Sequence, residues 1–194
     1  MHLTHAPFTV HKIVPLTISR GTTTGSTNFW VRLSADGIEG WGEASPFSIG
    51  SLTLTNDNTA TDLDAIAAAI SPCHPLEHQR IEAILDRLNP GSAARAAVDV
   101  ALWDWLGKYV GLPLWQLWGL DPQQIGPTAV TIGLNSPQGA CDRLHKWCAQ
   151  LDVRSVKVKL GSPDGITADQ RMFEALLPHI PKAAKVSIDA NGGW

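Results

Sequence analysis

Apolar and polar residues alternate along residues 8–43, the period of two that is typical of strands with one buried face. The alternation is interrupted at Asp36-Gly37, a dipeptide that favours a tight turn between two antiparallel strands. Residues 20–27, rich in Thr, Ser and Gly, are predicted to form a loop between strands. This part of the chain therefore predicts a small antiparallel sheet.

Three segments with helical periodicity follow. In the first two, apolar residues recur at helical spacing: Leu63, Ile66, Ala67 and Ile70, then Ile81, Ile84, Leu85 and Leu88, ending before Asn89-Pro90-Gly91. The third helix is predicted to begin with Ser92 as its N-cap. Its apolar stripe comprises Val98, Leu102, Trp105, Leu106 and Tyr109. Alanines on its other faces, Ala94, Ala96, Ala97 and Ala101, predict a central, closely packed helix.

From Pro127 onward the pattern alternates between strand-like and helix-like segments. Strands are predicted over residues 128–134, 153–160 and 185–190. Helices are predicted to open at Ser136-Pro137 and at Thr167. Their apolar stripes comprise Ala140, Leu144, Trp147, Cys148 and Leu151 in the first helix, and Ala168, Met172, Ala175 and Leu176 in the second. Repeated strand–helix units predict a parallel sheet covered by helices.

Composition excludes several function classes. The 194 residues are 44% hydrophobic, enough to bury a core, and the formal net charge of −3 comes without a basic run, so neither a nucleic acid nor an anionic membrane is indicated as a partner. No apolar stretch is long enough to span a membrane and the start lacks a signal-peptide pattern, so we expect a cytoplasmic protein. Of the three cysteines, Cys141 and Cys148 lie too far apart on a helix for a disulfide.

Charged residues suited to catalysis gather at the ends of the last two predicted strands. Lys157 and Lys159 are two positions apart, so their side chains share one face of a strand, and each charge makes the other lysine harder to protonate. The next strand ends in Asp189, followed by Asn191, at the edge where barrel enzymes place their sites. Two alternatives stay open: the lysines could form the solvated face of an edge strand, and Asp189 to Asn191 could be a simple turn.

A longer signature runs from Ala96-Ala97-Val98-Asp99-Val100-Ala101-Leu102-Trp103-Asp104 through Gly111-Leu112-Pro113-Leu114 to Leu117-Trp118-Gly119. It resembles the signature of the mandelate racemase and muconate lactonizing branch of the enolase superfamily. Lys157-Val158-Lys159 and Asp189-Ala190-Asn191 sit where that family keeps its Lys-x-Lys and its first metal-binding Asp. The segments Ile18-Ser19-Arg20-Gly21, Gly42-Glu43-Ala44-Ser45-Pro46 and Thr128-Ala129-Val130-Thr131 most resemble the dipeptide epimerases.

This resemblance implies an α+β cap domain, an antiparallel sheet plus helices, over residues 1–126. It implies the first part of a (β/α) TIM-type barrel over residues 127–194, about three of eight strands and therefore an incomplete barrel. It also implies a Mg²⁺-dependent isomerase that removes the α-proton of a carboxylate substrate through an enediolate, most similar to dipeptide epimerisation. Muconate cycloisomerase and o-succinylbenzoate synthase activities on the same fold are the alternatives, and a non-catalytic fragment or assembly partner is a further one.

The resemblance assigns roles to four residues of the last two strands. Lys159 would be the base on one face of the α-carbon, and Lys157 would lower the pKa of Lys159 and help neutralise the substrate carboxylate. Asp189 would bind Mg²⁺, which prefers hard oxygen ligands. Asn191 would orient the site or bond the ligand sphere of the metal, with a turn-forming role as the alternative.

Two further residues are candidates for substrate binding. Arg20 would pair with a distal acidic group of the substrate, and its alternative is a solvated surface position. Thr131 would line the pocket from the end of the first barrel strand. Residues 1–194 alone are expected to be inactive and to self-associate through an open sheet edge, whereas the full-length protein is expected to be a homo-oligomer acting on a small carboxylate, a dipeptide above all.

Overall fold

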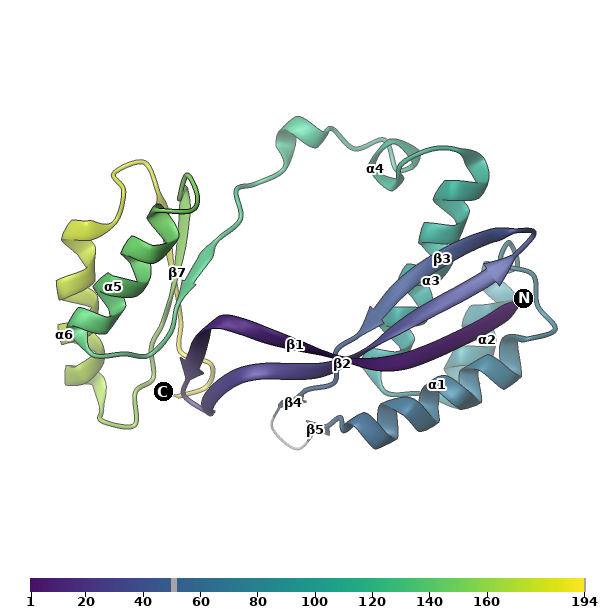
Figure 1. The fold of residues 1–194 in the computed structure, drawn as a ribbon, viewed down its shortest axis with the longest axis horizontal. Helices are drawn as coiled ribbons and strands as arrows, with labels where there is room; N and C mark the ends of the chain where they lie inside the picture. Colours follow the sequence, from purple (N-terminus) through teal and green to yellow (C-terminus); the bar gives the residue numbers. More distant parts are fainter. Residues whose placement is uncertain (50–51, 194) are drawn as a thin grey trace. The chain divides into compact units, whose positions relative to one another are not determined.

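The computed structural model describes residues 1–49 and 52–193, whose contacts divide the chain into two compact units (Figure 1). The first unit comprises Met1–Val10 and Ser26–Gln123. The second comprises His11–Gly25 and the chain from Gln124 onward. Residues His11–Gly25, which hold the turn between the first two strands, thus group with the second unit. The division proposed from the sequence, at residue 126, would place them in the first.

The first sheet is a meander of three strands in the order β1 (His2–Ile18), β2 (Gly21–Ala35) and β3 (Ile38–Ala44). Strands β2 and β3 are antiparallel, with pairs running from Phe29↔Ala44 to Ala35↔Ile38. Asp36 and Gly37 connect them with φ values of 53° and 75°, the left-handed conformations that a two-residue turn of this hand requires. The hairpin predicted at this dipeptide is confirmed.

Helices cover this sheet in the first unit. They are α1 (Asn56–Ile70), α2 (His78–Leu88), α3 (Ser92–Val110) and the short α4 (Leu114–Leu117), preceded by the small strands β4 (Ser48–Ile49) and β5 (Leu52–Thr53) and followed by the 3-10 turn η1 (Pro122–Gln124). Helix α2 ends as predicted, because Asn89 turns left-handed with a φ of 48°. The core contains the fully buried side chains of Val31, Leu33, Leu63, Ile66, Leu102 and Trp105.

Helix α3 packs unusually close to β3 (Figure 1). Gly40 and Gly42 of β3 have no side chain, and this lets the carbonyl oxygens of Ala101 and Ala97 approach the strand backbone. A Cβ atom at either glycine would overlap those carbonyl oxygens. The alanines of α3 that face the strand, Ala97 and Ala101, are fully buried, which confirms the predicted close packing.

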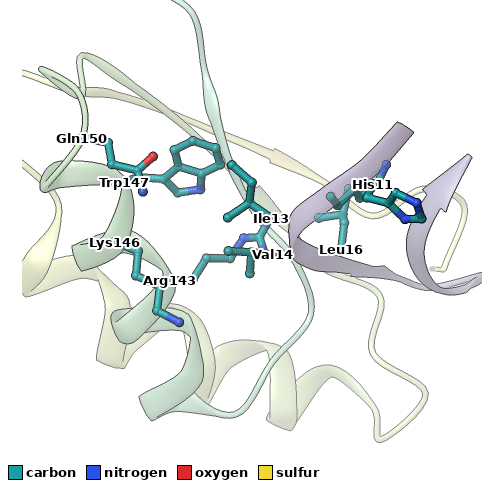
Figure 2. Close-up of a pocket in the computed structure, with 9 residues that line it drawn as sticks. His11, Ile13, Val14, Leu16, Arg143, Lys146, Trp147 and Gln150 are labelled. Carbon is teal, nitrogen blue, oxygen red and sulfur yellow. The ribbon is translucent and has the colours of Figure 1, made fainter. Parts of the chain in front are cut away.

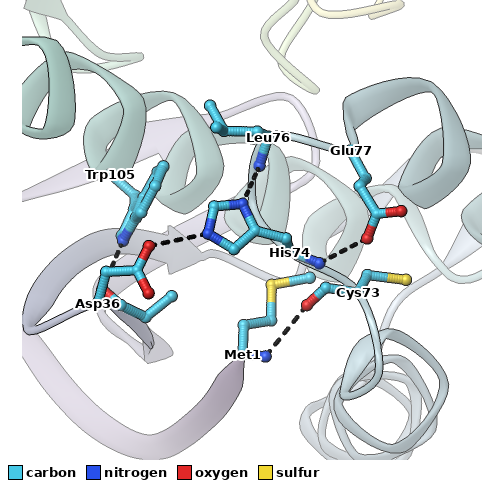
Figure 3. Close-up of polar contacts among 8 residues, drawn as sticks. Met1, Asp36, Cys73, His74, Leu76, Glu77 and Trp105 are labelled. Carbon is cyan, nitrogen blue, oxygen red and sulfur yellow. Dashed lines mark hydrogen bonds and ion pairs between the residues drawn. The ribbon is translucent and has the colours of Figure 1, made fainter.

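A set of polar contacts fastens the turn between α1 and α2 to the hairpin (Figure 3). The His74 Nε2 lies 2.8 Å from the Asp36 Oδ2, and the Glu77 carboxylate accepts the backbone N–H of His74 at 2.7 Å. That backbone bond and the Arg80 guanidinium hold the pKa of Glu77 below its usual value. The amino group of Met1 donates to the Cys73 carbonyl at 3.1 Å, so the residue directly before β1 is fixed to the same turn.

The second unit has a parallel sheet in the order β6 (Val130–Ile132), β7 (Ser155–Lys159) and β8 (Lys185–Asp189). Helices α5 (Pro137–Cys148) and α6 (Ile166–Leu176) lie side by side on one face, and the 3-10 turn η2 (Leu177–His179) follows α6 (Figure 1). Their shared core contains Val130, Ile132, Ala140, Leu144, Val156, Val158, Met172 and Leu176. The α+β cap and the first strands of a β/α barrel, expected from the sequence, are confirmed.

Two sequence-based expectations about element ends are wrong. Residues 20–27 are no loop, since the turn occupies Ser19 and Arg20 and β2 begins at Gly21. Thr is β-branched and favours extended backbone, and the Thr17 and Thr22 hydroxyls bond across the hairpin at 2.8 Å. Ser92 is the first helical residue of α3 rather than its N-cap, because the carbonyl of Gly91 already accepts the first intrahelical bond.

Two of the predicted apolar stripes end at residues that face solvent. Tyr109 is 47% exposed and stacks on Trp105 at a centroid distance of 4.8 Å, while Cys148 and Leu151 lie exposed at the end of α5. Cys73, Cys141 and Cys148 are free thiols. Within the described residues no helix combines the length and apolar character needed to cross a membrane.

Candidate active site

The parallel register of the second sheet places the candidate residues on one face. Lys157 pairs with Thr131 of β6 and with Ser187 of β8, and Lys159 pairs with Asp189. Val156 and Val158 alternate with these lysines along β7 and point to the other face, where they are fully buried under the helices. Strand periodicity therefore separates an apolar, helix-covered face from a face with two lysines and a carboxylate, as the sequence predicted.

The two lysines converge on a single oxygen atom. The Nζ atoms of Lys157 and Lys159 each lie 2.8 Å from the Oδ2 of Asp189. The side chain of Lys159 is only 11% exposed, against 39% for Lys157, so Lys159 is the more shielded from water. The other carboxylate oxygen, Oδ1, accepts the backbone N–H of Asn191 at 2.9 Å. Asp189 is thus surrounded by three donors, two of them cationic.

These three donors lower the pKa of the Asp189 carboxyl. The ammonium group of Lys157, then that of Lys159, then the Asn191 N–H hold the pKa of the Asp189 carboxyl far below its usual value. The ionised form is therefore favoured in the folded protein. The contribution of this ionisation to stability is complete above the ordinary pKa of 3.8 and is lost as the pH falls towards the depressed value.

We expect Lys157→Met to raise the pKa of the Asp189 carboxyl towards its ordinary value, because it removes the largest cause of the depression. The measurement is a pH titration of the Asp189 carboxyl carbon by NMR in the wild type and the variant. Lys182→Met, at an exposed lysine outside the site, is the matched control and should leave the titration unchanged. An ordinary pKa for Asp189 in the wild-type protein would contradict the geometry.

The loop after β8 brings Arg20 to the same site. Asn191 has a φ of 51°, and its backbone carbonyl accepts the Arg20 Nη1 at 3.1 Å and the Ser19 hydroxyl at 3.3 Å. The turn of the β1–β2 hairpin therefore lies against the loop that follows Asp189. The Oδ1 of Asn191 is buried and has no hydrogen-bond partner among the described residues. Such an oxygen is costly to bury unless a ligand satisfies it.

The loop after β7 is held by a residue that the sequence reading missed. Asp169, in the first turn of α6, is only 3% exposed, and its carboxylate accepts the backbone N–H groups of Gly161 at 2.8 Å and Ser162 at 3.1 Å. It fixes the segment that directly follows Lys159. Its position in the first turn of a helix, where a carboxylate complements the helix dipole, was the signal available in the sequence.

Thr131 is the middle residue of β6, beside Lys157, rather than the residue at the end of the strand. Its side chain is half-buried, and its backbone carbonyl accepts the Nε of Arg143 at 2.8 Å. The structure therefore places Lys157, Lys159, Asp189 and Thr131 on one face, with Asn191 and Arg20 at its edge.

The fit to a magnesium ion rests on the oxygen donors at this edge. Asp189 supplies a carboxylate, and Asn191 supplies a buried amide oxygen that lacks a partner. Mg²⁺ prefers such hard oxygen ligands. Across the described residues no group of three His, Cys, Asp or Glu side chains could hold a metal ion. The residues present thus fit part of a Mg²⁺ coordination shell.

Comparison with known proteins gives a consistent family assignment. Residues 3–119 match the model of the mandelate racemase / muconate lactonizing enzyme N-terminal domain. A hydrophobic dipeptide epimerase of Flavobacteria bacterium (strain MS024-2A) is 38% identical over 96% of the chain and 54% of that relative. An L-Ala-D/L-Glu epimerase of Bacteroides thetaiotaomicron is 30% identical over the whole chain and 48% of that relative. The chain spans about half the length of the curated relatives it matches.

A solved structure extends this likeness to the second unit. The dipeptide epimerase of Enterococcus faecalis V583, crystallised with Mg and the dipeptide L-Leu-L-Tyr, superposes with a TM-score of 0.88 at 26% identity, covering 100% of this chain and 54% of that one. The antiparallel sheet with its helices and the start of the barrel therefore have counterparts in that enzyme. On the match over residues 3–119 and these relatives, the chain belongs to the mandelate racemase / muconate lactonizing enzyme family of the enolase superfamily.

Proposed function

We propose that the protein is a Mg²⁺-dependent isomerase that epimerises dipeptides by removing the proton next to a carboxylate. The observation that carries this proposal is the convergence of Lys157 and Lys159 on one oxygen of Asp189 at the ends of adjacent strands. Two lysine amines at one site can divide the work, one as a general base and the other as a positive charge for the substrate carboxylate. The names of the relatives, hydrophobic dipeptide epimerase and L-Ala-D/L-Glu epimerase, support the substrate class.

Lys159 is the proposed base because it is the more shielded of the two lysines. Its side chain is 11% exposed, so its Nζ lies in the more enclosed part of the site. Lys157, at 39% exposure, is more open to a ligand and is placed to pair with the substrate carboxylate. Asp189 and Asn191 would hold the metal ion, which supplies positive charge to the carboxylate as the neighbouring proton leaves.

Arg20 is the proposed determinant of substrate choice. Its side chain is exposed, and a hydrogen bond to the Asn191 carbonyl holds it beside the site. The remaining donors of its guanidinium could pair with the side-chain carboxylate of an acidic dipeptide. An apolar dipeptide offers no such partner, so the same arginine would discriminate between the two substrate types named for the relatives.

The function is tested in the full-length protein by exchange of substrate α-hydrogen with deuterated water, in the presence of Mg²⁺, for an acidic dipeptide such as L-Ala-L-Glu and an apolar one such as L-Leu-L-Tyr. We expect exchange with at least one dipeptide and its loss on chelation of the metal. Arg20→Met should raise KM for the acidic dipeptide roughly ten- to hundredfold and leave that for the apolar one nearly unchanged. Equal losses on both would remove Arg20 from substrate recognition.

Muconate cycloisomerase activity is the second candidate, because the matching family model also covers muconate lactonizing enzymes. Turnover of cis,cis-muconate without exchange of any dipeptide would establish it in place of epimerisation. o-Succinylbenzoate synthase activity is tested in the same way with its own substrate. Absence of all three activities in the folded full-length protein would favour a non-catalytic role.

A further inference from the structure

A pocket of about 330 Å³ lies in the second unit, away from the lysine and aspartate cluster. Helix α5 lines one side with Arg143, Lys146 and Trp147, and the β1 segment from His11 to Leu16 lines the other (Figure 2). Both sides belong to the same unit. The volume is within the usual range of small-ligand pockets, roughly 300–1,000 Å³.

The pocket carries positive charge without compensation. Its lining includes Lys12, Arg143 and Lys146, with His11 beside them, and contains no Asp or Glu. Arg143 is only 7% exposed and donates to two backbone carbonyls, those of Thr131 at 2.8 Å and Pro15 at 2.7 Å. No carboxylate of the described part of the chain forms an ion pair with it. Burial alone lowers the pKa of this guanidinium, with no anion nearby to offset the effect.

An uncompensated buried cation is costly, and proteins normally pair it with an anion. The planar guanidinium of Arg143 has donors beyond the two that the backbone carbonyls engage, and these suit a carboxylate. The Nε1 of Trp147 is buried and has no acceptor among the described residues, so a second donor at the pocket also lacks a partner. The remaining donors of Arg143 and the Nε1 of Trp147 both suit a ligand that supplies oxygen acceptors.

The rest of the lining is apolar. Val14, Leu16 and the ring of Trp147 provide hydrocarbon surface next to the cationic groups. A ligand that satisfies both parts has an anionic head and an apolar body. We propose that this pocket binds a small carboxylic acid with an aryl or branched alkyl body, at a site separate from the one formed by Lys157, Lys159 and Asp189.

The proposal is tested by calorimetric titration of the protein with 3-phenylpropionate and with 3-phenylpropanamide, which has the same shape without the charge. We expect saturable binding of the acid, about tenfold or more tighter than that of the amide. Lys146→Gln, at an exposed position that lines the pocket, should weaken binding of the acid severalfold. Arg143→Lys, which keeps the charge and loses the planar fork, should weaken it further.

Two controls separate this pocket from the proposed active site. Lys182→Gln removes a charge from an exposed lysine that does not line the pocket and should leave binding unchanged. Lys159→Ala should also bind the acid normally, so the result is independent of whether the protein is an epimerase. No saturable binding of the acid, equal binding of the amide, or unchanged affinity in both pocket variants would each overturn the proposal.

Discussion

Replacing Lys159 with Ala is expected to abolish exchange of the substrate α-hydrogen with deuterated water when the substrate is one of the two stereoisomers. A base must reach the proton from one face of the α-carbon, and the shielded Nζ of Lys159 is the proposed base on that face. A positioned general base contributes roughly 10²- to 10⁴-fold to the rate, so the loss should be of that order. The measurement follows deuterium incorporation into each stereoisomer separately by proton NMR.

Lys159→Arg sharpens this experiment because it preserves the positive charge next to Asp189. Arginine stays protonated at any accessible pH, so it can pair with the carboxylate yet cannot accept a proton. We therefore expect the same loss of exchange as in Lys159→Ala, with a folded protein. Lys182→Ala is the surface control and should exchange like the wild type. Undiminished exchange with both stereoisomers in Lys159→Ala would remove this residue from the mechanism.

Replacing Gly42 with Ala should strongly destabilise the first unit. The new Cβ would overlap the carbonyl oxygen of Ala97, a backbone atom in the middle of α3 that cannot rotate away. Strand and helix must then separate, which opens the core around them. Overpacking of a rigid core typically costs about 1–3 kcal/mol, and a clash with the α3 backbone rather than with a flexible side chain puts this variant at or above about 3 kcal/mol. Thermal unfolding followed by circular dichroism measures the loss.

The matched control is Gly126→Ala, because a Cβ at this glycine would meet no atom within 4 Å. It makes the same chemical change without a clash, and it should unfold close to the wild-type temperature. A melting temperature for Gly42→Ala equal to that of Gly126→Ala would show that α3 does not lie against β3 as the structure has it.

Local sequence patterns determined which elements form. Asp36-Gly37 specified its turn because few residues tolerate two successive left-handed conformations. Ser136 and Pro137 specified the start of α5, where the serine hydroxyl accepts the N–H of Gly139 at 3.1 Å. The period of two also put Lys157 and Lys159 on one face. Such signals depend on neighbours along the chain, so a sequence carries them in full.

Residues far apart in the sequence decided the rest. The pairing of both lysines with Asp189 depends on the register between β7 and β8, which the packed core of the parallel sheet sets. Asp169 reaches the loop after Lys159 only because α6 folds back onto the sheet, and Arg143 reaches Pro15 only because β1 extends to α5. Composition and periodicity report only on residues that are near each other along the chain, so they do not predict such contacts. Whether a buried charge is stable depends on the groups that the tertiary fold brings next to it.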